Sequence, residues 1–392
     1  MTMRIHTCLA AMLFVWLNAP PAFAQQTASD VISFLVTNQA VPTGDFQKDA
    51  AAAAATRDTI ARALLVNLTS VPIPSSSSGF VYRLNPELGT MERASDSFGT
   101  FFVERALTSG HGRLSLGAAG TTMAFDRLDG FNLRDGTFVT VANRFRDEPQ
   151  PFDVESLTLR IRSSTLTLFG SYGLTDRLEI GAAVPLVQLH VEGSRVNVYR
   201  GQQYVQASAT ADASGLADVA VRGKYTLVRA PSGGVAVAAE WRLPTGDAAN
   251  LLGAGESAVR VVAIGSLDRG PWGVHGNAGF VRGGVSDEAD ASGAVTYAVR
   301  PHVSVTGEVL VRHLSDLYGI QSVAVPHPTI AGVDTYRLLP TTNPATLSSI
   351  VAGVKWNVAS TVVLGGKVLW SLRPYGLTAP ITPTVSIDYL FR

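Results

Sequence analysis

The residue types that most often carry out catalysis occur in this sequence without a catalytic spacing. Six of the seven histidines lie beyond residue 24, and none belongs to an HExxH metal-binding motif. The sequence also lacks the GxSxG nucleophile turn and the GxxxxGKS/T phosphate-binding loop. In the stretch "HGN", His275 and Asn277 fall on one face of a strand, where a hydrogen-bonded polar pair explains them better than a hydrolase site. We therefore expect no enzyme, no metal site and no cofactor.

Charged and polar residues instead recur at every second position of many segments. Within Asp218–Leu227, Arg222 and Lys224 share one face, and Val221 and Tyr225 share the other. Strict alternation of this kind is typical of a β-strand with two unlike faces. The charged faces supply these candidates for the lining of an interior: Arg222, Lys224, Glu240, Arg242, Arg260, His275, Asn277, Glu308, Arg312, Lys355, Lys367 and Asp388.

Two interpretations of this charged lining remain open. Because basic residues outnumber acidic ones in it, the lining could attract anionic or carboxylate-bearing solutes to a pore. Alternatively, arginine and lysine pair with glutamate and aspartate in a structural lattice that fills a narrow interior. The formal net charge of the chain is zero, so no basic surface indicates nucleic-acid binding. We expect no nucleic-acid partner.

The apolar faces of the same segments indicate a membrane protein. Many segments are about 9–11 residues long, which is the length of a tilted strand that crosses a bilayer. Charged residues make up only 16% of the chain, whereas soluble domains carry about 25%. No run of about 18 apolar residues follows residue 24, so we expect no transmembrane helix. A soluble sandwich would turn its apolar faces inward, whereas a barrel turns them toward lipid.

The connections between these segments alternate between short and long. Ala230–Gly233 is short, whereas Gly193–Gly215 and Ser315–Ala345 are long. Bacterial outer-membrane barrels have this asymmetry, with tight periplasmic turns and long external loops. We predict an all-β fold: a transmembrane antiparallel β-barrel of about 12–14 strands, surrounded by outer-membrane lipid, over residues 98–392. Its aromatic girdles would contain Tyr172, Tyr225, Trp241, Trp272, Tyr297, Trp356, Trp370 and Tyr389.

One predicted hairpin changes the phase of its alternation. Apolar residues stand at even positions up to Pro185 and at odd positions from Val187 onward. Such a slip is typical of a β-bulge, and we expect one near Pro185. In the preceding strand, the pattern assigns Arg160 and Arg162 to the inward face.

The first 97 residues differ from the predicted barrel. Residues 1–24 have the charged start, apolar run and small-residue site of a secretory signal peptide, with cleavage near Ala24. Cys8, the only cysteine, lies within this signal. Residues 25–97 form a helical segment, with Asp45 or Asp49 as a helix cap, followed by the linker "PIPSSSSG". This segment could be a hatch in the lumen, a periplasmic extension or a packing element, and we favour the hatch.

Four stretches of the sequence carry a family resemblance. They are "YGLTDRLEIGAAVPLV", "SGLADVAVRGKYTL", "WRLPTGD" and "GPWGVHGNAGF". Together they resemble the outer-membrane transporter family of the meta-pathway phenol-degradation type, which is similar to channels for fatty acids and aromatic hydrocarbons. The resemblance covers Leu157–Phe280 and, more loosely, the final strands, and it implies passive transport (a channel) for small hydrophobic, aromatic or amphipathic solutes. It supplies no binding residues to carry over.

The predicted function follows from the barrel and the resemblance together. We expect a porin-like, monomeric channel for a small-molecule solute in the outer membrane of a Gram-negative bacterium. The barrel-assembly machinery would insert it after export. The alternative is a structural or adhesion barrel that binds an external partner through its long loops, above all Ser315–Ala345.

Overall fold

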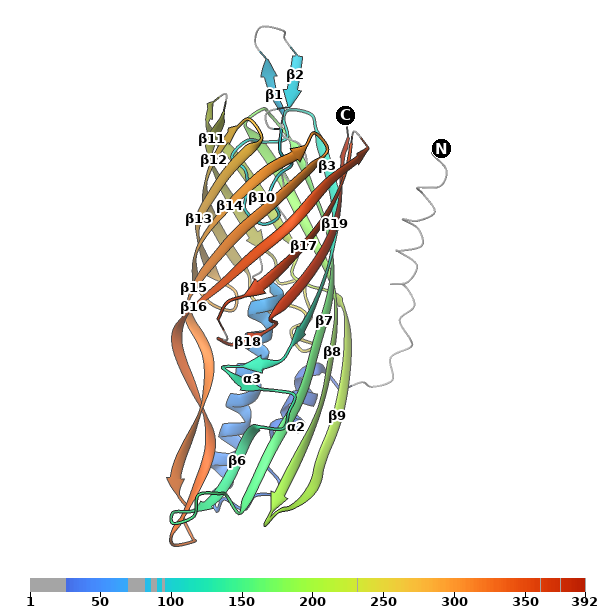
Figure 1. Cartoon of the computed structure of the whole chain (residues 1–392). Coiled ribbons are helices and arrows are strands. Elements are labelled where there is room, and N and C mark those ends of the chain that lie inside the picture. Colours follow the sequence, from blue (N-terminus) through green and yellow to red (C-terminus); the bar gives the residue numbers. More distant parts are fainter. Residues whose placement is uncertain are drawn as a thin grey trace.

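The computed structural model is dominated by a β-barrel (Figure 1). It describes residues 26–69, 82–85, 90–93, 96–230, 232–359, 361–373 and 375–391. The predicted signal peptide and the linker "PIPSSSSG" lie outside the described residues. The barrel strands are β3 (Leu114–Phe125), β7 (Asp153–Gly173), β8 (Leu178–Tyr199), β10 (Ala220–Ala230), β11 (Gly233–Arg242), β12 (Ala258–Arg269), β13 (Trp272–Gly283), β14 (Glu288–Arg300), β15 (Val303–Pro326), β16 (Val333–Ala359), β17 (Val362–Ser371) and β19 (Ile381–Phe391).

The ladder of hydrogen-bonded strands closes on itself. Each barrel strand pairs with its neighbours in antiparallel fashion, and β3 pairs with β7 on one side and with β19 on the other. Because the ladder returns to its first strand, it avoids the unpaired edges of an open sheet. The described chain therefore forms a closed, twelve-stranded antiparallel barrel, and the predicted fold class is confirmed.

The outer surface of the barrel is apolar. Val237 and Val261 are among the large hydrophobic side chains exposed there. Seven of the eight predicted girdle aromatics are exposed as well, from 38% for Trp370 to 52% for Trp272. Tyr297 is half-buried, with its ring centroid 4.5 Å from that of Trp272. An apolar surface that extends over the outside of the barrel is suited to lipid rather than to water.

The two ends of the barrel differ (Figure 1). Short turns join the strands at the end that holds the C-terminus. At the opposite end, β7, β8, β15 and β16 extend well beyond the barrel, and β6 (Phe138–Phe145) and β9 (Gln202–Leu216) pair with these extensions. Since outer-membrane barrels keep their short turns in the periplasm, we call the two ends the periplasmic end and the outer end.

Two of the predicted long loops are wrong. Gly193–Gly215 lies within a pair of strands, the outer part of β8 and β9. Ser315–Ala345 largely continues the β15–β16 ladder, which reaches Pro326 and Asp334. The lipid-type alternation is missing from these segments because they lie beyond the lipid, where an outward face can be polar.

The predicted bulge near Pro185 is also wrong, and the phase change has another cause. β7 and β8 pair without a register shift along their whole length. Even positions of β8 face outward throughout, with Ile180 exposed in the barrel and Gln188 exposed beyond it. Odd positions face inward, where Val187 and Leu189 are buried. The apolar face therefore changes sides where the strand leaves lipid and enters water.

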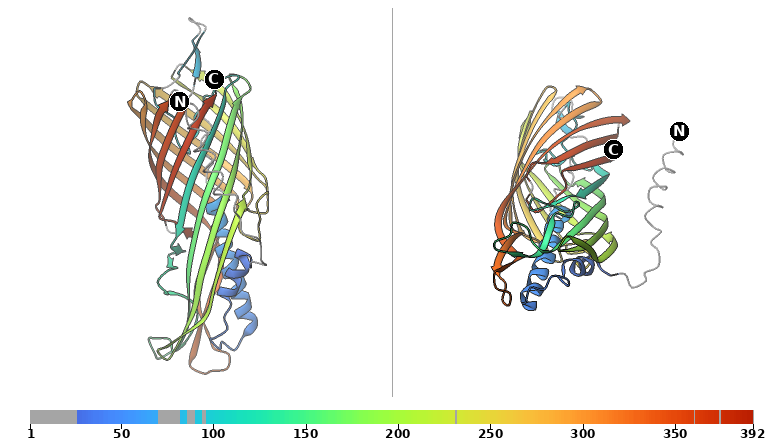
Figure 2. Two further views of the ribbon diagram at one scale, coloured as in Figure 1. Left: turned by 90° about the vertical axis from the view of Figure 1, so that its right-hand side faces the viewer. Right: turned by 60° about the horizontal axis from the view of Figure 1, so that its bottom comes forward.

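Two helices pack inside the shell that the strand extensions form (Figure 2). Helix α2 (Ala28–Val36) begins with a capping box, in which the side chains of Thr27 and Asp30 bond each other's backbone N–H groups at 3.1 and 3.2 Å. Helix α3 (Phe46–Thr69) begins after Asp45, one of the two predicted caps. No helix in the described part of the chain is both long and apolar enough to cross a membrane.

The second half of α3 reaches the outer mouth of the barrel (Figure 1). Its Ile60 and Leu64 are fully buried in one core with Leu159 of β7. The amide of Asn67 donates a hydrogen bond to the carbonyl of Leu377 at 2.8 Å. That carbonyl belongs to a small sheet made of β18 (Leu377–Thr378), β4 (Arg127–Leu128) and β5 (Phe131–Asn132). A separate hairpin of β1 (Tyr82–Asn85) and β2 (Thr90–Arg93) lies beyond the periplasmic end.

The first barrel strand begins later than the predicted boundary at residue 98. β3 starts at Leu114, and residues 97–110 contain no strand. All of these residues except Phe102, which is half-buried, are buried inside the periplasmic end of the barrel. We call residues 97–110 the plug. The hatch predicted within residues 25–97 stays a prediction.

Candidate functional site

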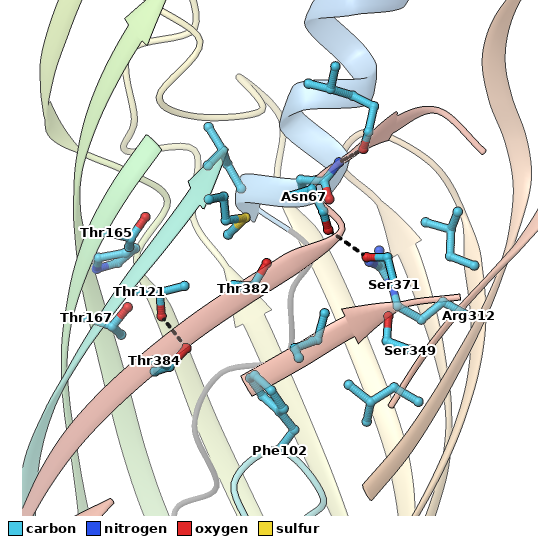
Figure 3. Close-up of a pocket in the computed structure, with 18 of the residues that line it drawn as sticks. Asn67, Phe102, Thr121, Thr165, Thr167, Arg312, Ser349, Ser371, Thr382 and Thr384 are labelled. Atoms are coloured by element: carbon cyan, nitrogen blue, oxygen red, sulfur yellow. Dashed lines mark hydrogen bonds between the residues drawn. The ribbon is translucent and has the colours of Figure 1, made fainter. Parts of the chain in front are cut away.

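A cavity of about 160 Å³ lies inside the barrel between α3 and the plug (Figure 3). Asn67 and Leu68 of α3 line it on the outer side, and Phe102 of the plug lines it on the periplasmic side. Its walls come from both flanks of the barrel, including β3, β7, β15, β16, β17 and β19. We call this cavity the chamber. An apolar cavity of about 150 Å³ accepts a molecule of benzene, so the chamber has room for one small ring.

The chamber lining combines apolar side chains with hydroxyl groups. Leu310, Leu347 and Leu369 supply apolar surface from three adjacent strands. On the next two strands, β19 and β3, the hydroxyls of Thr384 and Thr121 bond each other at 3.0 Å. Ligand sites typically combine an apolar wall with a few convergent polar groups. The hydroxyl-bearing lining residues are Thr121, Thr165, Thr167, Ser348, Ser349, Ser371, Tyr375, Thr378, Thr382 and Thr384.

A second, smaller cavity adjoins the chamber. It measures about 50 Å³ and shares Phe102, Arg242 and Arg312 with the chamber lining. It extends toward β12, β13 and β14, where Arg260 and Asp290 line it. This volume suits one or two water molecules rather than a ring.

The plug is fastened to the barrel wall mainly through its backbone. The carboxylate of Glu308 accepts hydrogen bonds from three consecutive N–H groups, those of residues 101–103. The bonds to Phe102 and Val103 measure 3.0 and 3.3 Å. From the neighbouring strand, Lys355 donates to the carbonyl of Thr100 at 2.7 Å. Hydrogen bonds in which one partner is charged are the strong ones, so this end of the plug is firmly held.

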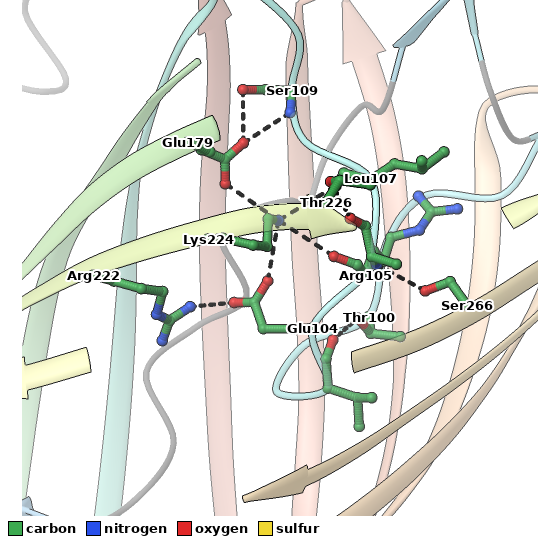
Figure 4. A network of polar contacts seen from close by, with 12 residues as sticks. Thr100, Glu104, Arg105, Leu107, Ser109, Glu179, Arg222, Lys224, Thr226 and Ser266 are labelled. Carbon is green, nitrogen blue, oxygen red and sulfur yellow. Dashed lines mark hydrogen bonds and ion pairs between the residues drawn. The ribbon is translucent and has the colours of Figure 1, made fainter. Parts of the chain in front are cut away.

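A second group of charges holds the other end of the plug (Figure 4). The ammonium of Lys224 donates to the carbonyls of Arg105 and Leu107, both at 3.3 Å, and lies 3.3 Å from the Glu179 carboxylate. Glu179 in turn accepts hydrogen bonds from the backbone N–H and the hydroxyl of Ser109, both at 2.8 Å. A buried ammonium and carboxylate therefore hold the plug between them.

Ion pairs neutralise most of the remaining interior charge. Arg222 pairs with Glu104 of the plug and, at 2.7 Å, with Glu240 of the wall. This is the lattice that the second interpretation of the charged lining predicted. Further pairs join Arg105 to Asp268 at 2.9 Å, Arg260 to Asp290 at 2.5 Å and Arg312 to Glu288 at 2.6 Å.

The twelve predicted lining residues all lie on the inner face of the barrel, but few of them reach the chamber. Arg242, Arg312 and Lys367 line it. His275 bonds the hydroxyl of Ser266 at 3.0 Å, within the wall. Four of the twelve are half-buried, namely Arg222, Arg242, Arg260 and Arg312. The other eight are buried, namely Lys224, Glu240, His275, Asn277, Glu308, Lys355, Lys367 and Asp388.

Sequence reasoning missed the plug and misplaced two arginines. Glu104 and Arg105 were overlooked because residues from 98 onward were assigned to the barrel. The three consecutive apolar residues 101–103 break strict alternation, and this signal could have excluded a strand. Arg160 and Arg162 are exposed on the outer face of the β7 extension instead of facing inward, and Arg160 lies 3.7 Å from Glu192. Within the described ranges, no group of three or more His, Cys, Asp or Glu side chains could hold a metal ion.

Several solved structures resemble this fold. An outer-membrane channel from Pseudomonas putida F1 is 15% identical, over 73% of this chain and 98% of that chain, with a TM-score of 0.46. The transport unit of the autotransporter AIDA-I from Escherichia coli is 11% identical, over 71% and 90%, with a TM-score of 0.37. The CymD monoaromatic hydrocarbon channel is 9% identical, over 72% and 89%, with a TM-score of 0.26. No curated protein sequence matches the chain.

A family model matches the part of the chain that carried the resemblance in sequence. The match extends over residues 129–317, which includes β7 to β14 and most of β15. The expected resemblance is thereby confirmed. Residues 129–317 match the model of the family described as "Putative MetA-pathway of phenol degradation".

Proposed function

We propose that this protein is a passive outer-membrane channel for small hydrophobic, aromatic or amphipathic solutes. The observation that carries the proposal is the chamber: a ring-sized cavity inside a closed barrel, with an apolar and hydroxyl-bearing lining. A transmembrane barrel with a ligand-sized space on its axis offers a route past the apolar outer wall. The matched family's description, which names phenol degradation, agrees with a solute that contains an aromatic ring.

Both ends of the chamber are obstructed, which limits how a solute could pass through the barrel. α3 lies across the outer side and the plug across the periplasmic side. Passage therefore requires the plug or the end of α3 to move. We infer a slow, selective channel rather than a wide aqueous pore, because a porin leaves its lumen open to water. The apolar and hydroxyl-bearing lining supports solute passage.

Export and assembly complete the proposal. The chain would be exported through cleavage near Ala24, inserted by the barrel-assembly machinery, and active as a monomer. Support for the monomer comes from the barrel itself, since twelve strands close within one chain and the lumen belongs to that chain alone.

Entry of benzyl alcohol into vesicles tests the function. The vesicles should have lipopolysaccharide in the outer leaflet, which slows unassisted permeation of apolar solutes. Purified protein is expected to speed entry. Ser349→Trp, which fills the chamber, should return the rate to that of protein-free vesicles. Ile350→Trp is the matched control, because Ile350 is the next residue of β16 and faces lipid, 41% exposed. Equal entry with and without the protein, or equal loss in both variants, would refute the proposal.

A further inference from the structure

Lys367 of β17 is a buried cation that faces the chamber. Its side chain is only 6% exposed, and it lines the cavity near the plug. Its ammonium lies 3.3 Å from the ring centroid of Phe102 and 5.1 Å from that of Phe101. Among the residues that the structure describes, none forms an ion pair or a hydrogen bond with this ammonium. The described contacts of the charge are therefore two aromatic faces.

The other buried or half-buried cations nearby have oxygen partners. Arg242 lies 3.0 Å from Glu240, and Arg312 lies 2.6 Å from Glu288. Lys355, on the adjacent strand, donates to the plug backbone. The carboxylate of Glu308 attracts Lys367 electrostatically, but its hydrogen bonds go to the plug N–H groups. Lys367 thus differs from these cations, because its ammonium has no such oxygen partner among the described residues and faces the chamber.

A buried ammonium whose direct contacts are ring faces, with the carboxylates of Glu308 and Asp388 interacting only over a longer distance, is incompletely compensated. Aromatic faces attract cations, but they replace the lost hydration only in part. An ammonium has three N–H donors, which prefer oxygen acceptors. The charge therefore favours an anionic oxygen that enters from the cavity.

The residues around Lys367 define what the rest of such a ligand must be. On one side its cross-strand neighbour is Thr384, whose hydroxyl lines the chamber and can donate to an anion. Toward the outer end, Leu369 on the same strand and Leu310 on β15 give apolar walls. The phenyl ring of Phe102 closes the periplasmic side. The site offers a charged and hydroxylated corner beside a ring-sized apolar space.

We infer that Lys367 is an anion-binding residue of the chamber, and that the chamber prefers a small aromatic monoanion, such as an aromatic carboxylate. The carboxylate lies on the ammonium of Lys367 and the hydroxyl of Thr384, and the ring lies against Leu310 and Leu369. This inference rests on the proposed channel function and names its solute class. The competing role for Lys367 is purely structural: its ammonium would clamp the ring of Phe102 and hold the plug.

Equilibrium binding separates these roles. Isothermal titration of the purified full chain in detergent compares benzoate with benzyl alcohol, which has the same ring and no charge. The wild type is expected to bind benzoate at least about tenfold more tightly, as a charge-assisted contact implies. Lys367→Met, which keeps the length of the side chain, should lower the affinity for benzoate to about that for benzyl alcohol, whereas the affinity for benzyl alcohol should change far less. Lys367→Arg should keep the preference. Heat-dependent migration on gels confirms that each variant is a folded barrel.

Each result decides the inference. Equal binding of the two ligands by the wild type, or no binding of benzoate, overturns it without any variant. A parallel loss of both ligands in Lys367→Met overturns it in favour of the clamp. These outcomes are distinct from failure of the channel function, because entry of benzyl alcohol into vesicles does not depend on a preference for anions. A channel that passes benzyl alcohol but ignores benzoate would refute the anion site alone.

Discussion

Replacing Glu308 by glutamine should loosen the plug. The carboxylate of Glu308 is 2% exposed and accepts from three backbone N–H groups of the plug. Hydrogen bonds to charged groups contribute about 1.5–3 kcal/mol each, and neutral ones about 0.5–1.5 kcal/mol. Glu308→Gln keeps the shape, removes the charge and replaces one of the two accepting oxygens by an NH2 group that cannot accept, so the three bonds lose roughly 1 kcal/mol each on average. The sum of about 3 kcal/mol corresponds to about a 150-fold larger population of displaced plug.

A cysteine in the plug reports this population. Ala106 is fully buried when the plug is seated, and the only natural cysteine lies in the predicted signal peptide. In an Ala106→Cys background, a water-soluble maleimide reacts with the thiol only when the plug leaves its site. We expect Glu308→Gln to raise the labelling rate by about two orders of magnitude, in proportion to the displaced population.

The matched control is Glu288→Gln. Glu288 is also buried, at 4% exposure, but its carboxylate pairs with Arg312 of the wall. This substitution removes a charge of the same kind and should leave the labelling rate nearly unchanged. Equal rates in the two variants would show that Glu308 does not hold the plug, and the argument from its three N–H partners would fail.

Two further predictions each compare a substitution that should be costly with a matched substitution that should be nearly neutral. Gly353→Ala should destabilise the barrel by about 1–3 kcal/mol, because its new Cβ would lie 2.4 Å from the ring of Phe101. The control is Gly307→Ala, which should be neutral because a Cβ at Gly307 meets nothing within 4 Å. Urea unfolding in lipid vesicles measures both, and equal effects would contradict the plug packing. Ala182→Lys should cost about 2–4 kcal/mol because Ala182 faces lipid, while Gln188→Lys, on the same face of β8 beyond the lipid, should cost almost nothing. Similar costs in the same unfolding assay would place the membrane boundary elsewhere.

Sequence reasoning succeeded where one physical rule governs a whole strand. From β10 to β14, lipid lies outside and the lumen inside, so alternation alone gives the strand, its faces and its length. Arg222 and Trp241 could be assigned to opposite faces from their positions alone. The same rule fails in the outer part of β8, because water replaces lipid there and the apolar residues, such as Val187, turn inward.

The plug and the chamber could not be derived in this way. The plug has no periodic pattern, since its backbone is satisfied by wall side chains that lie far along the sequence, such as Glu308 and Lys224. Its position depends on which strands become neighbours when the barrel closes. The unpaired character of Lys367 is equally invisible in sequence, because it depends on Glu308 being used elsewhere. Contacts between distant segments, rather than local preferences, create the candidate site.

The connection between the plug and β3 constrains the order in which the molecule can form. β3 follows the plug in the chain and pairs with β19, which comes after all the other barrel strands in sequence order. A helix is about 10–12 Å wide with its side chains, and α3 lies on the far side of the chamber from the plug. Once β3 and β19 have paired, a segment as wide as α3 can no longer pass along the barrel axis. The barrel strands must therefore assemble around α3 and the plug, and the pairing of β3 with β19 forms last.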